Sequence, residues 1–106
     1  MSLFFCIISK EWPLEAAEGR RIQLTFTSFN IEYHHRCLYD YVEVSSGTFK
    51  EKYCGPNYNG FYYNGNGDNI GTSIPSVPSV GRTMKVRFRS DSRVARTGFK
   101  ADWHEF

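Results

Sequence analysis

The fold is decided by the stretch Arg20-Arg21-Ile22-Gln23-Leu24-Thr25-Phe26-Thr27, in which apolar and polar side chains alternate strictly. Ile22, Leu24 and Phe26 fall on one side of an extended chain, and polar residues fall on the other. Because successive side chains of a β-strand point to opposite faces, this pattern predicts a strand with one buried face and one solvated face.

The same alternation returns further along the chain. Val42 and Val44 alternate with polar neighbours, residues 84–89 place Met84, Val86 and Phe88 on one side, and a last alternating run covers 98–103. No stretch shows convincing helical spacing. Strands with one dry and one wet face are typical of antiparallel sheets, so the predicted fold class is all-β, an antiparallel two-sheet sandwich.

Bulk composition limits the classes of protein that remain. The chain has 106 residues, enough for one modest core, and it is 41% hydrophobic, 17% aromatic and 23% charged, which is ordinary for a folded domain. A net charge of +2 from 13 basic and 11 acidic residues does not indicate a nucleic-acid binder. Three cysteines in so small a chain favour an oxidising, extracellular compartment.

Two segments stand apart from the alternating pattern. Residues 55–81 are crowded with Asn, Gly, Tyr, Ser and Pro and predict a long surface loop that holds one short strand. Residues 1–10 contain an apolar stretch that lacks the basic start and cleavage site of a signal peptide and is too short to cross a membrane, which needs about 20 apolar residues. For a secreted protein, the export signal is therefore missing from this sequence.

Three carboxylates follow or precede strand-like runs: Glu32, Asp40 and Asp91. Acidic residues at strand ends are placed to gather at one rim of a sheet structure, where a hard cation such as Ca²⁺ takes oxygen ligands. Taken one at a time, each acid is more simply explained as a soluble surface residue. Glu43 alternates with two valines inside a strand, so it is expected to face solvent and is left out of the site.

Other chemistry finds little support in the residues. The pair His34-His35 beside Cys37 suggests zinc only weakly, because adjacent side chains of a strand point to opposite faces. No spacing supports a Ser-His-Asp arrangement, and His104 lies near the chain end. The sequence therefore predicts a protein that is not an enzyme.

Motifs spread from Trp12 to Trp103 resemble those of the CUB domain, an extracellular module of proteases, spermadhesins and receptors. The early strand pattern, the run Cys37-Leu38-Tyr39-Asp40-Tyr41-Val42-Glu43-Val44, the pair Cys54-Gly55 and the run Ser90-Asp91-Ser92 occur in the family's order. Gly98-Phe99-Lys100-Ala101-Asp102-Trp103 completes the match. The resemblance implies a jelly-roll-like sandwich of the CUB/spermadhesin type and a disulfide between Cys37 and Cys54, a crosslink worth roughly 3 kcal/mol in the chain-entropy model.

The resemblance also implies a Ca²⁺ site, because the ligand positions of the calcium-binding subset correspond to Glu32, Asp40 and Asp91. A backbone carbonyl near Ser92 or Arg93 and water would complete the coordination. Such a site commonly recruits a lysine of a partner protein, and Tyr33 and His34 are the candidate flank for the lysine stem.

The chain departs from the family at its start. Family members begin with an additional strand region, and a cysteine of their first disulfide stands where this chain has Lys10. Cys6 is left as a buried thiol, an intermolecular link or the product of a wrong start, and the last is favoured. We therefore expect an atypical or truncated segment at 1–11 and a single CUB-like domain at 12–106.

Two functions remain. The leading hypothesis is a non-catalytic, extracellular, calcium-dependent protein-interaction module of a larger mosaic protein. The alternative is metal-independent binding of glycans or glycosaminoglycans through a basic strip made of Lys85, Arg87, Arg89, Arg93, Arg96 and Lys100. Alternating charges of this kind are more often a solvated sheet face.

Overall fold

The protein folds into strands joined by turns and loops, as seen in a computed structural model that describes residues 8–91 and 98–106. Within these residues there is no helix. The strands are β1 (Ile8–Glu15), β2 (Ile22–Asn30), β3 (Tyr41–Ser46), β4 (Phe49–Cys54), β5 (Tyr63–Asn64), β6 (Ser76–Pro78), β7 (Thr83–Ser90) and β8 (Gly98–Glu105).

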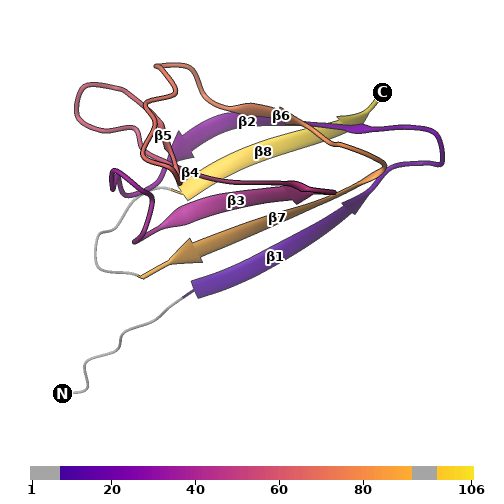
Figure 1. The fold of residues 1–106 in the computed structure, drawn as a ribbon, viewed down its shortest axis with the longest axis horizontal. Helices are drawn as coiled ribbons and strands as arrows, with labels where there is room; N and C mark the ends of the chain where they lie inside the picture. Colours follow the sequence, from indigo (N-terminus) through magenta and orange to yellow (C-terminus); the bar gives the residue numbers. More distant parts are fainter. Residues whose placement is uncertain (1–7, 92–97) are drawn as a thin grey trace.

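The strands form two sheets that pack face to face (Figure 1). One sheet has the order β1-β7-β3-β4-β5 and the other has the order β6-β2-β8. Every pairing between neighbouring strands is antiparallel. The predicted fold class, an all-β antiparallel sandwich of two sheets, is confirmed.

The core lies between the sheets and is made by the alternating positions that the sequence indicated. Ile22, Leu24 and Phe26 are buried on β2, and Met84 and Val86 face them from β7. Burying a side chain of this size stabilises the fold by about 1.5–3 kcal/mol, and β3, β4 and the loops add further buried residues such as Val42, Val44 and Tyr53. Aromatic rings fill one end, with Phe26 edge-on to Phe29 and to Phe99.

Glu43 does not behave as predicted, because it is only 8% exposed. It lies in the middle of β3, a central strand, with Arg87 of β7 and Lys52 of β4 directly opposite it on either side. Lys50 also approaches, with its Nζ 4.0 Å from Glu43 Oε1. Glu43 therefore lies between two paired strands in the middle of the sheet, where long side chains on either side of it leave little of it exposed.

Strand β1 was not among the predicted strands. It pairs with β7 along its whole length, from Ile8 opposite Ser90 to Glu15 opposite Thr83. Pro13 obscures the pattern in the sequence, but a proline is compatible with an edge strand, where its missing N–H can face away from the ladder. The strand crosses the expected boundary between 1–11 and 12–106, and residues 1–7 lie outside the described part of the chain.

The loop at 55–81 contains two short strands, β5 and β6, where one was expected. It also contributes to the core, since Tyr62 is buried and packs edge-on against Phe29. The turn after β5 is closed by Asn64, whose side-chain oxygen accepts hydrogen bonds from the N–H groups of Asn66 and Asp68, both at 3.0 Å. This segment is therefore an integral part of the sandwich and not only a surface connection.

Candidate metal centre

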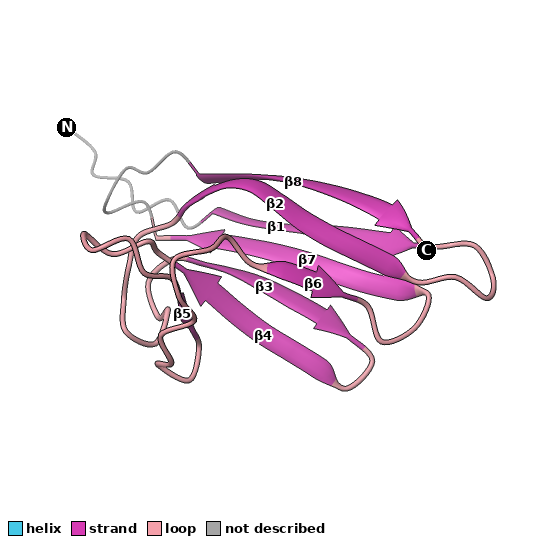
Figure 2. Cartoon of the chain, turned by 90° about the horizontal axis from the view of Figure 1, so that it is seen from above, coloured by secondary structure: helices cyan, strands magenta, loops and turns pink. Residues whose placement is uncertain are grey.

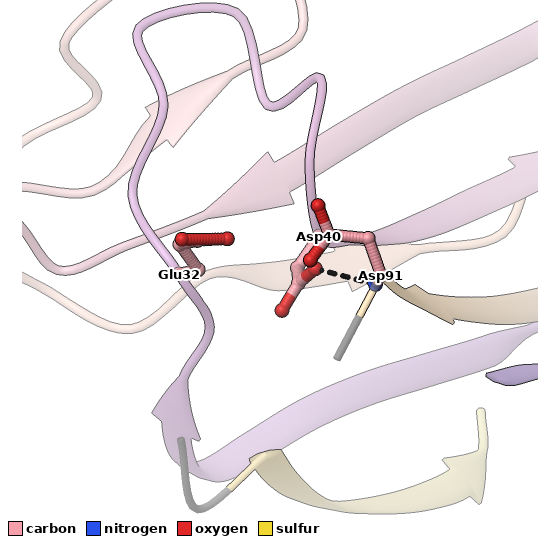
Figure 3. Close-up of side chains that lie close together, drawn as sticks. All are labelled: Glu32, Asp40 and Asp91. Carbon is pink, nitrogen blue, oxygen red and sulfur yellow. Dashed lines mark hydrogen bonds between the residues drawn. The ribbon is translucent and has the colours of Figure 1, made fainter. Parts of the chain in front are cut away.

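Glu32, Asp40 and Asp91 meet at one end of the sandwich (Figure 3). Glu32 follows β2, Asp40 precedes β3 and Asp91 follows β7, so three strand ends from both sheets supply the cluster. One carboxylate oxygen from each residue lies within 4.8 Å of the others. We call these three residues the acidic rim. Among the residues that the structure describes, they are the one group of three or more His, Cys, Asp or Glu side chains placed to share an ion.

The loop between β2 and β3 carries two of the three acids and is pinned to the neighbouring strand β4. Ile31 donates its N–H to the carbonyl of Gly55 at 2.8 Å and accepts the N–H of Gly55 at 3.0 Å, immediately before Glu32. The disulfide Cys37–Cys54, expected from the family resemblance, forms three residues before Asp40 and has a Cα–Cα distance of 5.5 Å. Both links limit the motion of the loop, which carries Glu32 near its start and Asp40 at its end.

Asp40 is the most buried member of the acidic rim, at 3% exposure. Its Oδ1 accepts the backbone N–H of Asp91 at 2.8 Å and its Oδ2 accepts the hydroxyl of Ser90 at 3.3 Å. Burial raises the pKa of Asp40, opposed by the Asp91 N–H and the Ser90 hydroxyl and assisted by the negative charge of the Asp91 side chain. The carboxylate is therefore oriented by β7 in a position where its negative charge is poorly solvated.

The donor set fits a hard divalent cation. All three side chains offer carboxylate oxygens, and no thiolate or imidazole takes part. Ca²⁺ binds oxygens at about 2.3–2.6 Å, so two oxygens on one ion are at most about 5 Å apart, which the spacing of the acidic rim satisfies. A bound cation would also offset both the repulsion among the acids and the burial of Asp40.

The other expected ligands, the carbonyl oxygens near Ser92 and Arg93, lie outside the described residues. The structure therefore shows where the three candidate side-chain ligands lie and does not describe the candidate backbone ligands.

The two residues expected to flank a bound lysine lie next to the acidic rim in an aromatic group. The ring of Tyr33 packs on the ring of Tyr63 with centroids 4.7 Å apart, and the ring of His34 packs on that of Tyr39 at 4.6 Å. Nδ1 of His34 accepts the N–H of Arg36 at 3.1 Å, which requires that nitrogen to be unprotonated. Desolvation, with His35 adding to it, lowers the pKa of His34.

Three supporting residues were not identified as site residues from the sequence. Ser90 orients Asp40, Tyr63 supports Tyr33 from the long loop, and exposed Tyr39 covers His34. Ser90 and Tyr39 stand directly beside site acids in the sequence, so neighbourhood alone could have indicated them. Nothing in the sequence connects Tyr63 with Tyr33, because the two residues are joined only by the fold.

The two adjacent histidines are arranged differently from the prediction. His34 and His35 do not lie in a strand with opposed side chains; they lie in the loop between β2 and β3, and their rings pack with centroids 4.5 Å apart. This arrangement still does not favour a zinc site, because the neighbouring Cys37 is bonded to Cys54 and is not free to bind a metal.

The basic strip is divided by the fold. Lys85, Arg87 and Arg89 share the outer face of β7, where Arg87 stands opposite Glu11 on one side and Glu43 on the other. Lys100 lies on β8, in the other sheet. Arg93 and Arg96 lie outside the described residues. Acidic neighbours thus interrupt the positive charge on β7.

Comparison with known proteins connects this architecture to a family. The sequence model described as "CUB domain" matches residues 8–103, which is nearly the whole chain. The chain belongs to the CUB domain family. CUB domains occur as non-catalytic accessory modules in proteases and receptors, and this chain is a non-catalytic domain of that family.

Two curated relatives show the kind of protein in which similar CUB domains occur. Adhesion G-protein coupled receptor G6 from Danio rerio is 33% identical over 97 residues, which cover 92% of this chain and 7% of the receptor. Tolloid-like protein 1 from Homo sapiens is 38% identical over 92 residues, which cover 85% of this chain and 8% of that protein. The chain thus spans less than a tenth of either relative.

Solved structures agree with the fold. The full extracellular region of zebrafish Gpr126/Adgrg6 matches with a TM-score of 0.74 and 30% identity, covering 92% of this chain and 11% of that one. The MASP-1 CUB2 domain, solved bound to Ca²⁺, matches with a TM-score of 0.64 at 20% identity, covering 92% of this chain and 77% of that one, a likeness of fold alone. A search of the described residues for helices long and apolar enough to span a membrane finds none.

Proposed function

We propose that this CUB domain is a calcium-dependent protein-interaction module of an extracellular mosaic protein. The observation that carries the proposal is the convergence of Glu32, Asp40 and Asp91 to within 4.8 Å of one another at one end of the sandwich. Three acids that come from separate strand ends, with one of them buried, are costly to hold together unless a cation offsets their charge.

Ca²⁺ supplies positive charge that holds the carboxylates together and orders the loops that carry them. Residues of the chain itself orient the carboxylates and hold the loop that carries them. Ser90 and the Asp91 N–H orient Asp40, and the Ile31–Gly55 bridge with the disulfide holds the loop on which Glu32 and Asp40 lie. The result is a partly hydrated acidic surface beside the aromatic rings of Tyr33 and His34.

A lysine of a partner protein fits this surface. Its ammonium group would donate charge-assisted hydrogen bonds to carboxylate oxygens of the acidic rim, and its aliphatic stem would lie on the rings of Tyr33 and His34. The packing of Tyr33 on Tyr63 supports this role, because a ring held by a neighbour loses little further freedom when it binds.

Calorimetric titration with CaCl₂ tests the metal site. We expect the wild-type chain to bind Ca²⁺ and the double variant Asp40→Ala, Asp91→Ala to show no binding. Glu11→Ala, Glu18→Ala is the matched control, since it removes two exposed acids elsewhere in the chain and should bind like wild type. Equal, poor binding by wild type and the Asp40 and Asp91 variant would show that the proposed site is wrong.

Lysine recognition is tested separately with a lysine-containing peptide and its acetylated form. Binding should require Ca²⁺, disappear on acetylation and weaken in Tyr33→Ala. Peptide binding that is the same in EDTA would contradict the proposal even if the chain binds calcium.

The glycan alternative predicts a different result. Heparin retention that persists in EDTA and disappears in Arg87→Glu, Arg89→Glu would favour it. The acidic neighbours of Arg87 make this the weaker candidate, because opposite charges reduce the potential that a polyanion meets.

A further inference from the structure

Tyr58 is the most exposed large hydrophobic residue among those that the structure describes, at 96%. It lies in the loop between β4 and β5, which Figure 2 shows at the end of the sandwich where β4 and β7 end. The acidic rim lies at this same end, since Asp91 directly follows β7. Exposed aromatic residues are common on protein surfaces, so the exposure of Tyr58 has meaning only together with its support and its neighbours.

The turn that carries Tyr58 is held by the residue before it, Asn57. Oδ1 of Asn57 accepts the N–H groups of Asn59 and Phe61, both at 3.0 Å. The backbone N–H of Asn57 donates to the carbonyl of Phe61 and its own carbonyl accepts the N–H of Gly60, both at 2.9 Å. These four hydrogen bonds fix the backbone on both sides of Tyr58. A partner that binds here therefore has to order little more than the side chain of Tyr58.

The same asparagine connects this turn to the residues beside the acidic rim. Nδ2 of Asn57 donates to Oη of Tyr63 at 3.3 Å, and the ring of Tyr63 packs on that of Tyr33 with centroids 4.7 Å apart. Tyr33 directly follows Glu32 of the acidic rim. Burial raises the pKa of Tyr33, and Coulombic interactions with Tyr63 and then Tyr58 raise it further, so the phenol of Tyr58 lies near that of Tyr33. We call these three tyrosines the tyrosine surface.

The tyrosine surface carries no charge. Residues 53–67, which include two of its members, contain no Lys, Arg, Asp or Glu. Tyrosine offers a large contact area with only two χ angles to fix, and it is enriched among the residues that dominate binding energy. An uncharged aromatic surface therefore adjoins a strongly acidic one.

A lysine bound at the acidic rim brings its neighbours in the partner chain to the tyrosine surface. An extended chain advances by about 3.3 Å per residue, so three residues on either side of the lysine cover about 10 Å. A charged side chain finds no opposite charge there. An aromatic side chain is removed from water and packs edge-on or offset on a tyrosine ring.

We propose that Tyr58 is a specificity-determining residue, which selects partner segments that carry an aromatic side chain within three residues of the bound lysine. The assignment rests on the calcium-dependent lysine binding proposed above and adds a second contact to it. Tyr58 is not one of the acids placed to share an ion, so it acts on the choice of partner and not on the affinity for Ca²⁺.

Binding of seven Gly/Ser heptapeptides with a central lysine, measured in CaCl₂, tests the proposal. One peptide has no aromatic residue, and each of the others has a single phenylalanine at one of the remaining positions. At least one phenylalanine peptide should bind the wild-type chain about tenfold or more tightly than the phenylalanine-free peptide, and this gain should vanish in EDTA.

Variants of the chain assign the gain to its residue. Tyr58→Ala should bind all seven peptides alike, and Tyr58→Phe should keep the gain because it keeps the ring. Val80→Ala is the matched control, since it removes an exposed apolar side chain near the start of β7, at the opposite end of the sandwich, and should bind like wild type. Calcium titration of Tyr58→Ala should give the wild-type affinity, which shows that the acidic rim is intact.

The outcomes separate this role from the lysine site itself. If no peptide binds the wild-type chain in CaCl₂, both proposals are wrong. If the phenylalanine-free peptide binds in a calcium-dependent way but no phenylalanine improves it, only the role of Tyr58 is wrong. A gain that survives in Tyr58→Ala likewise overturns the role of Tyr58 and leaves the lysine site standing.

Discussion

Asp40 is both buried and a member of the proposed calcium site. Its side chain is enclosed just before the start of β3, yet it points toward two other acids and accepts hydrogen bonds from Ser90 and Asp91 at the end of β7. The sequence motifs identified the three acids, and their positions in the chain placed them at the ends of strands. The burial of Asp40 could not be predicted, because it depends on how closely the end of β7 approaches the start of β3.

The raised pKa of Asp40 predicts a pH dependence of stability in calcium-free protein. Because the folded state holds this proton more tightly than the unfolded state, the free energy of unfolding should fall as the pH rises from the ordinary pKa of 3.8 through the raised one. Calcium binding, which needs the ionised form, should strengthen over the same range.

Urea unfolding in EDTA at a series of pH values, compared with Asp40→Asn, measures this slope. The variant has no titrating group at this position, so its free energy of unfolding should fall less than that of the wild type as the pH rises. An identical pH profile for the two proteins would show that burial does not raise the pKa of Asp40.

At the scale of elements, alternation predicted the strands that face the core but not those at the margins. β2 and β7 were predicted because each buries every second residue against the other sheet. β1 was missed because Pro13 and two acids mask an alternation that an edge strand tolerates. Glu43 was placed correctly on the outer face, and its burial comes from neighbouring strands whose identity only the sheet order reveals.

Ser79 joins two elements far apart in the chain and carries an element-scale prediction. It is fully buried after β6, and its hydroxyl accepts the N–H of Ile22 at the start of β2 at 2.7 Å. In Ser79→Ala the buried amide of Ile22 loses its acceptor, so the free energy of unfolding should fall by about 1–3 kcal/mol.

Urea denaturation checks this value against Ser76→Ala. Ser76 is exposed on β6 and bonds the Gln23 side chain at 2.7 Å, so its loss should cost about 0.5 kcal/mol or less. Equal losses in the two variants would mean that the Ser79 hydroxyl does not anchor β2.

For the whole molecule, the acidic rim connects both sheets, since Glu32 follows a strand of one and Asp40 and Asp91 adjoin strands of the other. An ion bound there should stabilise the sandwich as a unit. At a Ca²⁺ concentration 100 times Kd, binding to the folded state alone adds about 2.7 kcal/mol, which corresponds to a rise in Tm of roughly 10 °C or more for a domain of this size.

Thermal unfolding with CaCl₂ and with EDTA measures this rise. Asp40→Ala, Asp91→Ala should melt at one temperature in both buffers. A calcium-dependent rise that is the same in the variant and the wild type would place the ion elsewhere in the protein.

The sequence by itself determined the all-β class, the central strands, the residue types of the acidic rim and, through family resemblance, the disulfide Cys37–Cys54. These follow from local alternation and from motifs whose order along the chain can be read directly. Only the tertiary structure decided that three distant acids lie within 4.8 Å, that Glu43 is buried in the middle of a sheet, and that β8 ends its sheet among the described residues. Each of these depends on which strands become neighbours, and that choice is made by packing the two sheets around one core.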